Sequence, residues 1–420
     1  MPRHWEFSYF FLLVYLFCRK KHIFESNYFT SLMLYIPESS YEDYLTYKIK
    51  KGDTLLSVAQ DLGVEPYLLR SYHNRYVPST KDLIEADFPH HLEYLILEPQ
   101  KVAFSDEEKE QNRTKTNTSG SFKLSLDNSH INNSYSVLYS IEKGPNVYHI
   151  KQEFNVRWRA RNEDGYSFFE VDRIGDLYIN DTQTSTMADE IAEKASAALY
   201  PLLVVVDQSG KWVYINNFNQ IEERWIEAKK QIKKYYKGEL VEKYISIYDR
   251  NLEDSDSLYI SLSKDWFLNA FFNEIHIEYP ASLSIQKEQE FPFMAKSDNL
   301  NFKVEQKVDE YLDIDNFLVI DINGQLNDQR TKTDLEKELG LPVKEYSEEK
   351  ATGNYRAKYF LNPQKHMPEV IFISCDLAFE TPQKFSVTIS NKDDQKEMSA
   401  KPEPQLFVEE VEPKKKWWQF

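Results

Sequence analysis

The segment from Thr46 to Pro99 carries the most restrictive local pattern in the chain. Its first residues alternate between apolar and charged side chains, as in a strand with one buried face, and Lys-Gly-Asp-Thr at residues 51–54 follows as a turn. Asp53 and Thr54 are both placed to cap the free amides of a helix over Leu55–Leu62. The apolar residues of this helix recur at spacings of three and four, so one of its faces is expected to be buried.

The rest of this segment predicts a second helix and a returning strand. Gly63 is placed to end the first helix, and Pro66 fits the first turn of the next one. A long loop follows, and Leu92–Leu97 has the composition of a strand. The predicted order is therefore strand, helix, helix, strand.

This order and the residues at its start resemble the LysM family. The family pattern K-x-G-D-T-L-x-x-[IV]-A stands here at residues 50–59, as Lys-Lys-Gly-Asp-Thr-Leu-Leu-Ser-Val-Ala. The resemblance covers residues 46–99 and implies binding of glycans that contain N-acetylglucosamine, such as peptidoglycan or a chitin-like polymer. It places the groove between the loop after the first strand and the loop before the last. The residues that it implies for the first loop are Gly52, Asp53, Thr54 and Leu55.

The second groove loop departs from the family pattern. The short Pro-Gly-Gln segment is missing, and residues 74–99 are longer than the family norm. Tyr76 and Phe88 in this loop are candidates for aromatic platforms under a sugar, or for residues that cover the small core. LysM-like folds also serve as protein-docking modules, and a fold does not determine a function.

The remainder of the chain predicts a larger body of the α+β class. Residues 100–120 are polar and charged and are expected to form a linker. Strand-like and helical segments mix over residues 121–295, with a helical middle, and residues 296–392 read as a β-rich domain or a continuation of the same one.

A repeated Asp-x-x-Gly pattern predicts antiparallel β-hairpins in this body. The pattern lies between apolar runs at Asp172–Gly175, Asp207–Gly210 and Asp321–Gly324. Asp opens a turn by accepting hydrogen bonds from the backbone ahead, and Gly adopts the positive φ that closes it.

The two ends of the chain have separate signals. Residues 1–33 hold a mostly apolar run that is shorter than the roughly 20 residues of a spanning helix and lacks a signal cleavage site. This stretch is either a short anchor, which places the protein in the cell envelope or periplasm, or a translated upstream stretch before a start at Met33, which places it in the cytoplasm.

The C-terminal tail, residues 393–420, is rich in Pro and Glu and is expected to be disordered. Trp417, Trp418 and Phe420 lie beside three lysines and form a candidate docking motif for a protein partner. Contact with a membrane interface and a plain solubilising tail are the alternatives.

Composition and motifs exclude several classes of chemistry. With 51 basic and 68 acidic residues the net charge is −17, which argues against a nucleic-acid-binding protein. No Gly-rich phosphate loop, zinc-ligand spacing or nucleophile elbow is present. Cys18 and Cys375 cannot form a disulfide framework, and Cys375 lies in an apolar run that predicts an inert buried thiol. We therefore expect neither an enzyme nor a cofactor.

Two functional hypotheses follow. In the first, a non-catalytic LysM-like protein binds peptidoglycan and anchors or scaffolds a cell-envelope assembly. In the second, the protein is a cytoplasmic adaptor of a contractile injection baseplate (type VI secretion or phage-tail-like), and its LysM-like module binds protein instead of sugar. The specific match at residues 50–59 favours the first hypothesis, whereas the missing Pro-Gly-Gln loop favours the second. We place peptidoglycan binding first and the adaptor second.

Overall fold

The computed structural model describes Tyr41 and residues 44–98, 114–116, 121–126, 131–183, 186–293, 297–313, 315–343 and 349–392. The predictions for residues 1–33, for the tail 393–420 with Trp417, Trp418 and Phe420, and for most of the linker 100–120 lie outside these residues. The described part is mixed α and β, with antiparallel sheets and eight α-helices. None of its helices is both long enough and apolar enough to cross a bilayer.

Residues 44–98 form a small unit with the predicted order of elements. They comprise β1 (Thr46–Lys48), α2 (Leu55–Leu62), α3 (Pro66–Tyr76), the short 3-10 helix η2 (Thr80–Asp82) and β2 (Tyr94–Ile96), and β1 pairs antiparallel with β2. The Thr54 hydroxyl accepts a hydrogen bond from the amide of Ser57, so it caps α2 as the sequence predicts. The core of this unit consists of Leu55, Val58, Ala59, Leu69, Ile84, Leu92 and Leu95.

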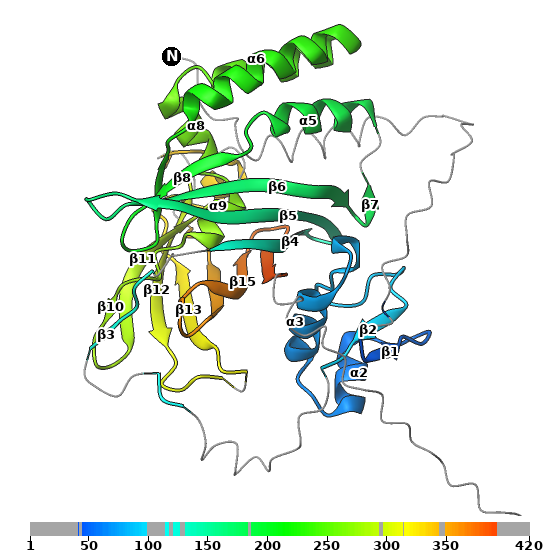
Figure 1. The fold of residues 1–420 in the computed structure, drawn as a ribbon, viewed down its shortest axis with the longest axis vertical. Helices are drawn as coiled ribbons and strands as arrows, with labels where there is room; N and C mark the ends of the chain where they lie inside the picture. The colour runs from blue at the N-terminus through cyan, green and yellow to red at the C-terminus, as the bar shows by residue number, and fades with distance from the viewer. Residues whose placement is uncertain are drawn as a thin grey trace, which may run out of the picture.

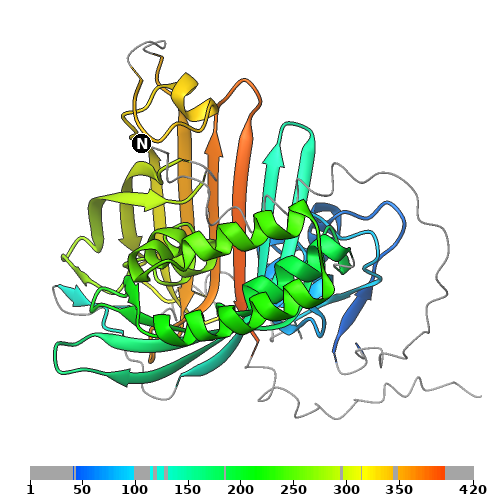
Figure 2. The ribbon, with the colours of Figure 1, turned by 90° about the horizontal axis from the view of Figure 1, so that it is seen from above.

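One antiparallel sheet of 12 strands forms the framework of the body (Figures 1 and 2). In spatial order the main strands are β11 (Ser284–Phe291), β12 (Leu300–Val308), β13 (Leu318–Leu326), β14 (Gly353–Leu361), β15 (Pro368–Leu377), β16 (Gln383–Asn391), β4 (Asn132–Lys143), β5 (Asn146–Arg161), β6 (Ser167–Ile179), β8 (Leu202–Val206) and β9 (Trp212–Ile215). The short β7 (Thr182–Gln183) pairs with β6, and β3 (Phe122–Lys123) with β10 (Glu278–Tyr279) forms a separate two-stranded sheet. Because β16 pairs with β4, residues on both sides of position 295 build one sheet.

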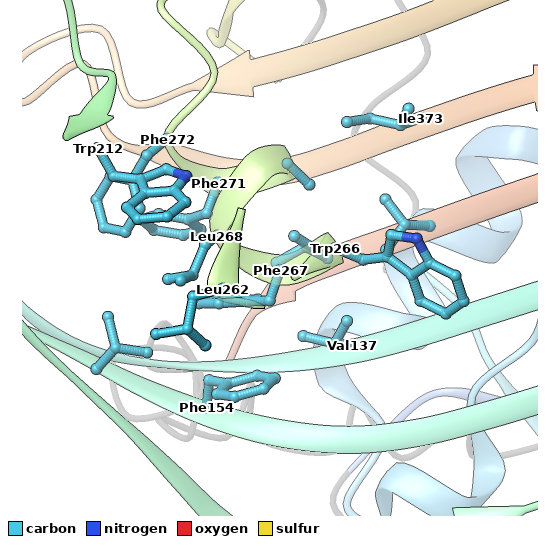
Figure 3. Packing of buried hydrophobic residues seen from close by; sticks show 14 of the residues in the cluster. Val137, Phe154, Trp212, Leu262, Trp266, Phe267, Leu268, Phe271, Phe272 and Ile373 are labelled. Atoms are coloured by element: carbon cyan, nitrogen blue, oxygen red, sulfur yellow. The ribbon is translucent and has the colours of Figure 1, made fainter. Parts of the chain in front are cut away.

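Helices cover one face of the large sheet. They are α5 (Met187–Ala197), α6 (Phe218–Tyr235), α7 (Glu239–Asn251), α8 (Ser255–Leu262) and α9 (Trp266–Phe271), and the short α10 (Lys332–Glu336) lies between β13 and β14 in the chain. Figure 3 shows the aromatic side chains of α9 packed between strands, with Phe154 beneath them. The rings of Phe154 and Phe267 stack with centroids 4.1 Å apart. These contacts place the main core between the sheet and the predicted helical middle.

The alternation along β4 separates the two faces of the sheet. Tyr135, Val137 and Tyr139 belong to the core under the helices, whereas Leu138 belongs to a separate cluster with residues of the small unit. Successive side chains of a strand point to opposite faces. The small unit therefore packs on the face opposite the helices.

Two of the three predicted hairpins are wrong. Asp207–Gly210 does connect β8 to β9, and the Asp207 carboxylate accepts hydrogen bonds from the amides of Ser209 and Lys211. The other two Asp-x-x-Gly patterns lie inside β6 and β13, which run on without a turn.

Both misleading glycines have a different role. Gly175, at φ 66°, lies in a bulge where residues 175–177 face the single residue Gln152 of β5. Gly324 lies where the backbone of Lys303 and the side chain of Val304 leave no room for a Cβ atom. A bulge and the close approach of a neighbouring strand therefore both require glycine, as a hairpin turn does.

Candidate binding groove

The structure places the six predicted groove residues in unequal environments. Gly52 and Thr54 are exposed and Asp53 is half-buried, all near the N-terminus of α2. Phe88 is half-buried and packs against the small core, and Leu55 is only 4% exposed. These residues frame a pair of loops, 52–55 and 85–89.

Tyr76 does not belong to this pair of loops. It is only 6% exposed, at the end of α3, and its ring lies 4.5 Å from that of Tyr72. It clusters with Val77 and, from the large sheet, Leu138. Its ring therefore covers the contact between the small unit and the body, and it presents no free face to a sugar.

Three backbone amides of the first loop are already bonded within the chain. The amide of Asp53 donates to the Lys50 carbonyl at 3.0 Å, and that of Thr54 donates to the Ser57 hydroxyl at 2.9 Å. The amide of Leu55 donates to Oδ1 of Asp87, in the second loop, at 2.7 Å. The amides of Asp53, Thr54 and Leu55, three of the four loop residues that the LysM resemblance implies, thus have partners within the chain.

Asp87 is the residue that joins the two loops, and the sequence reasoning missed it. Its Oδ1 also accepts from the amide of Phe88 at 2.8 Å, so one carboxylate oxygen holds both sides of the groove. A carboxylate is a favourable partner for the free amides at a helix N-terminus. The sequence shows Asp87 as an acidic residue in the long second loop, but no local pattern indicates that it binds the N-terminus of α2.

Asp53 stabilises the turn before α2. Its Oδ2 accepts hydrogen bonds from the amide of Lys50 and from the hydroxyl of Tyr47, each at 2.8 Å. These two bonds, with the amide of Lys50 as the larger cause, lower the pKa of the Asp53 carboxyl. The carboxylate therefore works as a local acceptor, and both of these donors come from the chain itself.

The second loop is pinned to α3 by an amide side chain. Asn74 donates to the carbonyl of Ile84 and accepts from its amide, both at 2.7 Å. Arg70 donates to the carbonyl of Glu85 at 2.9 Å. Asn74 is buried, so this pairing holds the long loop against α3.

The small unit is joined to the sheet by charged groups as well as by apolar contact. Arg75 of α3 forms an ion pair with Glu369 of β15, and its guanidinium lies over the ring of Phe317 with 5.1 Å to the centroid. Lys151 of β5 donates to the carbonyl of Lys81 at 2.5 Å and pairs with Asp181. Glu85 at the start of the second loop also accepts a hydrogen bond from Ser386 of β16, at 3.3 Å, whereas Gly52, Thr54 and Asp87 stay exposed.

A buried histidine stands behind the groove. Nδ1 of His73 accepts from the amide of Ile96 at 3.0 Å, and its Nε2 lies 3.2 Å from the carbonyl of Asp82. Burial lowers the pKa of His73 to about 4, so the ring is neutral at physiological pH. This ring links α3, η2 and β2 and has no access to a ligand.

The described residues hold no three His, Cys, Asp or Glu side chains that could together bind a metal ion. Cys375 is buried, and burial raises the pKa of its thiol well above the ordinary value. A thiol in that state is a poor nucleophile.

No model of a known protein family matches the chain, and neither does any curated protein.

Proposed function

We propose that this protein is a non-catalytic docking scaffold, in which the LysM-like unit at residues 46–99 binds protein in preference to sugar. The observation that carries the proposal is the hydrogen bond from the Leu55 amide to the Asp87 carboxylate. An acetyl carbonyl would have to replace a carboxylate at this amide, and a hydrogen bond to an ionised acceptor is about twice as strong as one to a neutral acceptor.

The aromatic residues support the same preference. Tyr76 is buried in the contact with the sheet, and Phe88 packs on the small core. On the small unit, Leu56 is 57% exposed, and Leu62 and Val64, at the C-terminal end of α2, are 41% and 42% exposed. The ring of Tyr67 in α3 is also 43% exposed, and an apolar surface of this kind favours a protein partner.

The attachment of the unit also favours a scaffold. An ion pair and an apolar cluster join α3 to the sheet, so the small unit has a fixed orientation on the body. In the setting that the resemblance suggests, a contractile injection or phage-tail-like baseplate, such a body positions one subunit against another. This setting rests on likeness of fold pattern alone.

Glycan binding is the second candidate, and one observation favours it. Gly52, Thr54 and Asp87 remain exposed at the mouth of the groove, so a glycan could reach the loop without moving the body. In that case the partner is peptidoglycan or a chitin-like polymer, and the second loop must withdraw Asp87 from Leu55.

Co-sedimentation of the full chain with purified, protein-free peptidoglycan separates the two candidates. The docking proposal predicts that the wild-type protein stays in the supernatant, whereas Asp87→Ala, which frees the amide, gains weak binding. Asp61→Ala changes an exposed acidic residue on α2 and is the matched control. Pelleting of the wild type that is lost in a folded Asp53→Ala/Thr54→Ala double variant would establish the glycan candidate instead.

The positive test uses a photo-crosslinking amino acid in cells of the source organism. Placed at Leu56 it should yield one discrete protein adduct, which a Thr54→Arg change at the groove mouth removes. The same amino acid at Tyr235, 66% exposed at the end of α6, is the control and should yield none. Adducts that form equally well in the Thr54→Arg variant would contradict docking at this groove.

A further inference from the structure

A cavity of about 150 Å³ lies between the sheet and the helices, away from the small unit. Strands β4, β5 and β6 form its floor, α5 forms one wall, and the junction of α8 and α9 forms the other. Most of its surface is aliphatic or aromatic, and the apolar lining includes Ile150, Leu177, Leu199, Leu262 and Trp266. Figure 3 shows Leu262 and Trp266 of this lining on either side of Phe267.

Arg173 introduces a charge into this apolar lining. It follows Phe169 and Val171 on the face of β6 that belongs to the core, at a position where an aliphatic residue is expected. Its guanidinium lies over the ring of Tyr200, 5.7 Å from the centroid. Within the described part of the chain the guanidinium makes no hydrogen bond and no ion pair, although it has five N–H donors.

Asp265 supplies the opposite charge at the other wall. Its Oδ1 caps α9 by accepting from the amide of Leu268 at 2.8 Å. No cation among the described residues forms an ion pair with its carboxylate, and burial raises the pKa of this carboxyl to about 6. Arg173 and Asp265 form no ion pair with each other or with another described residue. The lining also includes Asp189, Glu193 and Lys264, and Lys264 donates to the Ser297 carbonyl at 2.9 Å and to Oδ1 of Asn299 at 2.8 Å.

Unpaired charged groups in an apolar site are costly, and such sites are typical of ligand pockets. We propose that this cavity binds a small organic carboxylate with an apolar body and a hydroxyl group, in which the carboxylate pairs with Arg173 and the hydroxyl donates to Asp265. A guanidinium recognises a carboxylate through two parallel N–H···O bonds. The aliphatic lining then contacts the body of the ligand.

The volume limits the size of the ligand. A cavity of about 150 Å³ accommodates one benzene ring. Benzoate therefore fits as a probe for Arg173, 4-hydroxybenzoate adds the hydroxyl for Asp265, and benzamide is the neutral counterpart of nearly the same shape.

Calorimetric titration of the full chain at neutral pH tests the proposal directly. Benzoate should bind at least about tenfold more tightly than benzamide, since a hydrogen bond to a charged group is worth more than one to a neutral group. 4-Hydroxybenzoate should bind severalfold more tightly than benzoate. Equal affinity for benzoate and benzamide, or no binding of any probe at millimolar concentration, would overturn the assignment without recourse to a variant.

Three variants locate the site. Arg173→Gln should remove the preference for benzoate over benzamide. Ala192→Leu fills the cavity from α5, so it should weaken the binding of both probes by about tenfold or more and leave the melting temperature unchanged. Asp265→Asn keeps a helix cap and should remove the gain from the hydroxyl. Arg157→Gln on β5, whose guanidinium bonds to Asn132 in an exposed position, is the control and should bind as wild type. Benzoate binding that survives Ala192→Leu would place the ligand elsewhere and refute the proposal.

Discussion

The guanidinium of Arg75 lies 3.5 Å from the carboxylate of Glu369, and this pair joins the small unit to the sheet across nearly the whole length of the described chain. Both side chains are largely withdrawn from water, at 12% and 7% exposure, and Asn391 donates to the same carboxylate oxygen at 2.8 Å. Glu369 thus binds one group from the small unit and one from β16.

Removing the arginine should loosen this contact. Arg75→Ala removes the ion-pair partner of a buried carboxylate, and breaking a buried pair in this way costs about 3 kcal/mol of unfolding free energy. Urea unfolding should show the loss, and limited proteolysis should show faster cleavage in residues 44–98. Arg157→Ala, a half-exposed arginine on β5, should change neither. Unaltered proteolysis in Arg75→Ala would mean that the apolar cluster alone holds the unit.

Removing the carboxylate that bridges the groove should have a smaller effect. Asp87→Ala takes one acceptor from the N-terminus of α2 and from Phe88. The expected loss is about 1 kcal/mol, typical of a helix cap. Hydrogen exchange should show faster exchange of the Leu55 amide, with the amides of β5 unchanged. Asp61→Ala is the control for the lost charge, and equal exchange of Leu55 in both variants would refute the bond.

The buried histidine predicts a pH dependence of stability. The pKa of His73 is about 4 in the folded state, and the unfolded chain takes up a proton near the ordinary value of 6.5. Between these two pH values the unfolded state binds more protons, so the unfolding free energy falls as the pH is lowered. From pH 7 to pH 5 the loss from this one group is about 2 kcal/mol.

A variant isolates this contribution from others. His276 is also buried with a pKa lowered to about 4, and acts in the same direction, whereas the raised pKa of Asp265 acts in the opposite one. His73→Gln should therefore reduce the fall in unfolding free energy between pH 7 and pH 5 by about 2 kcal/mol. His90→Gln, which changes an exposed histidine, should keep the wild-type profile. Parallel profiles for wild type and His73→Gln would contradict a neutral ring in the fold.

The thiol of Cys375 should report on opening of the core. It lies on the core face of β15, with its pKa raised by burial and by Asp376. In a Cys18→Ser background, Ellman's reagent should leave Cys375 unmodified in native conditions and modify it fully in concentrated urea. Ala378→Cys, an exposed position just past β15, is the control and should react at once. Rapid native modification of Cys375 would show that the sheet opens without global unfolding.

The sequence was most informative where the determinants are local. The helix expected over Leu55–Leu62 has those bounds in the structure, because Thr54 caps it and Gly63 ends it in the left-handed conformation. Leu55, Val58 and Ala59 of the predicted apolar face are buried, whereas Leu62, its fourth member, is 41% exposed. Each of these features depends on neighbours within a few positions, so a linear pattern contains them.

Features that depend on distant partners could not be predicted in this way. The bond from Leu55 to Asp87 and the pairing of Arg75 with Glu369 join positions whose separation no pattern encodes. Gly175 carries the same local pattern as a hairpin turn, and only its partner strand makes it a bulge. Arg173 looks like an ordinary charged residue of a strand until the fold places it on the core face.

The place of β16 has a consequence for how the protein is made. This strand lies between β15 and β4, yet it is the last of the sheet's strands that a ribosome delivers. Until residues 383–391 emerge, the nascent chain holds two partial sheets, and the long strands β4 and β15 each have an edge with open hydrogen-bonding groups. Such edges pair readily with other chains. Synthesis therefore passes through a stage at which two strand edges of the nascent sheet are unpaired, and that stage ends when a single late strand joins the two halves.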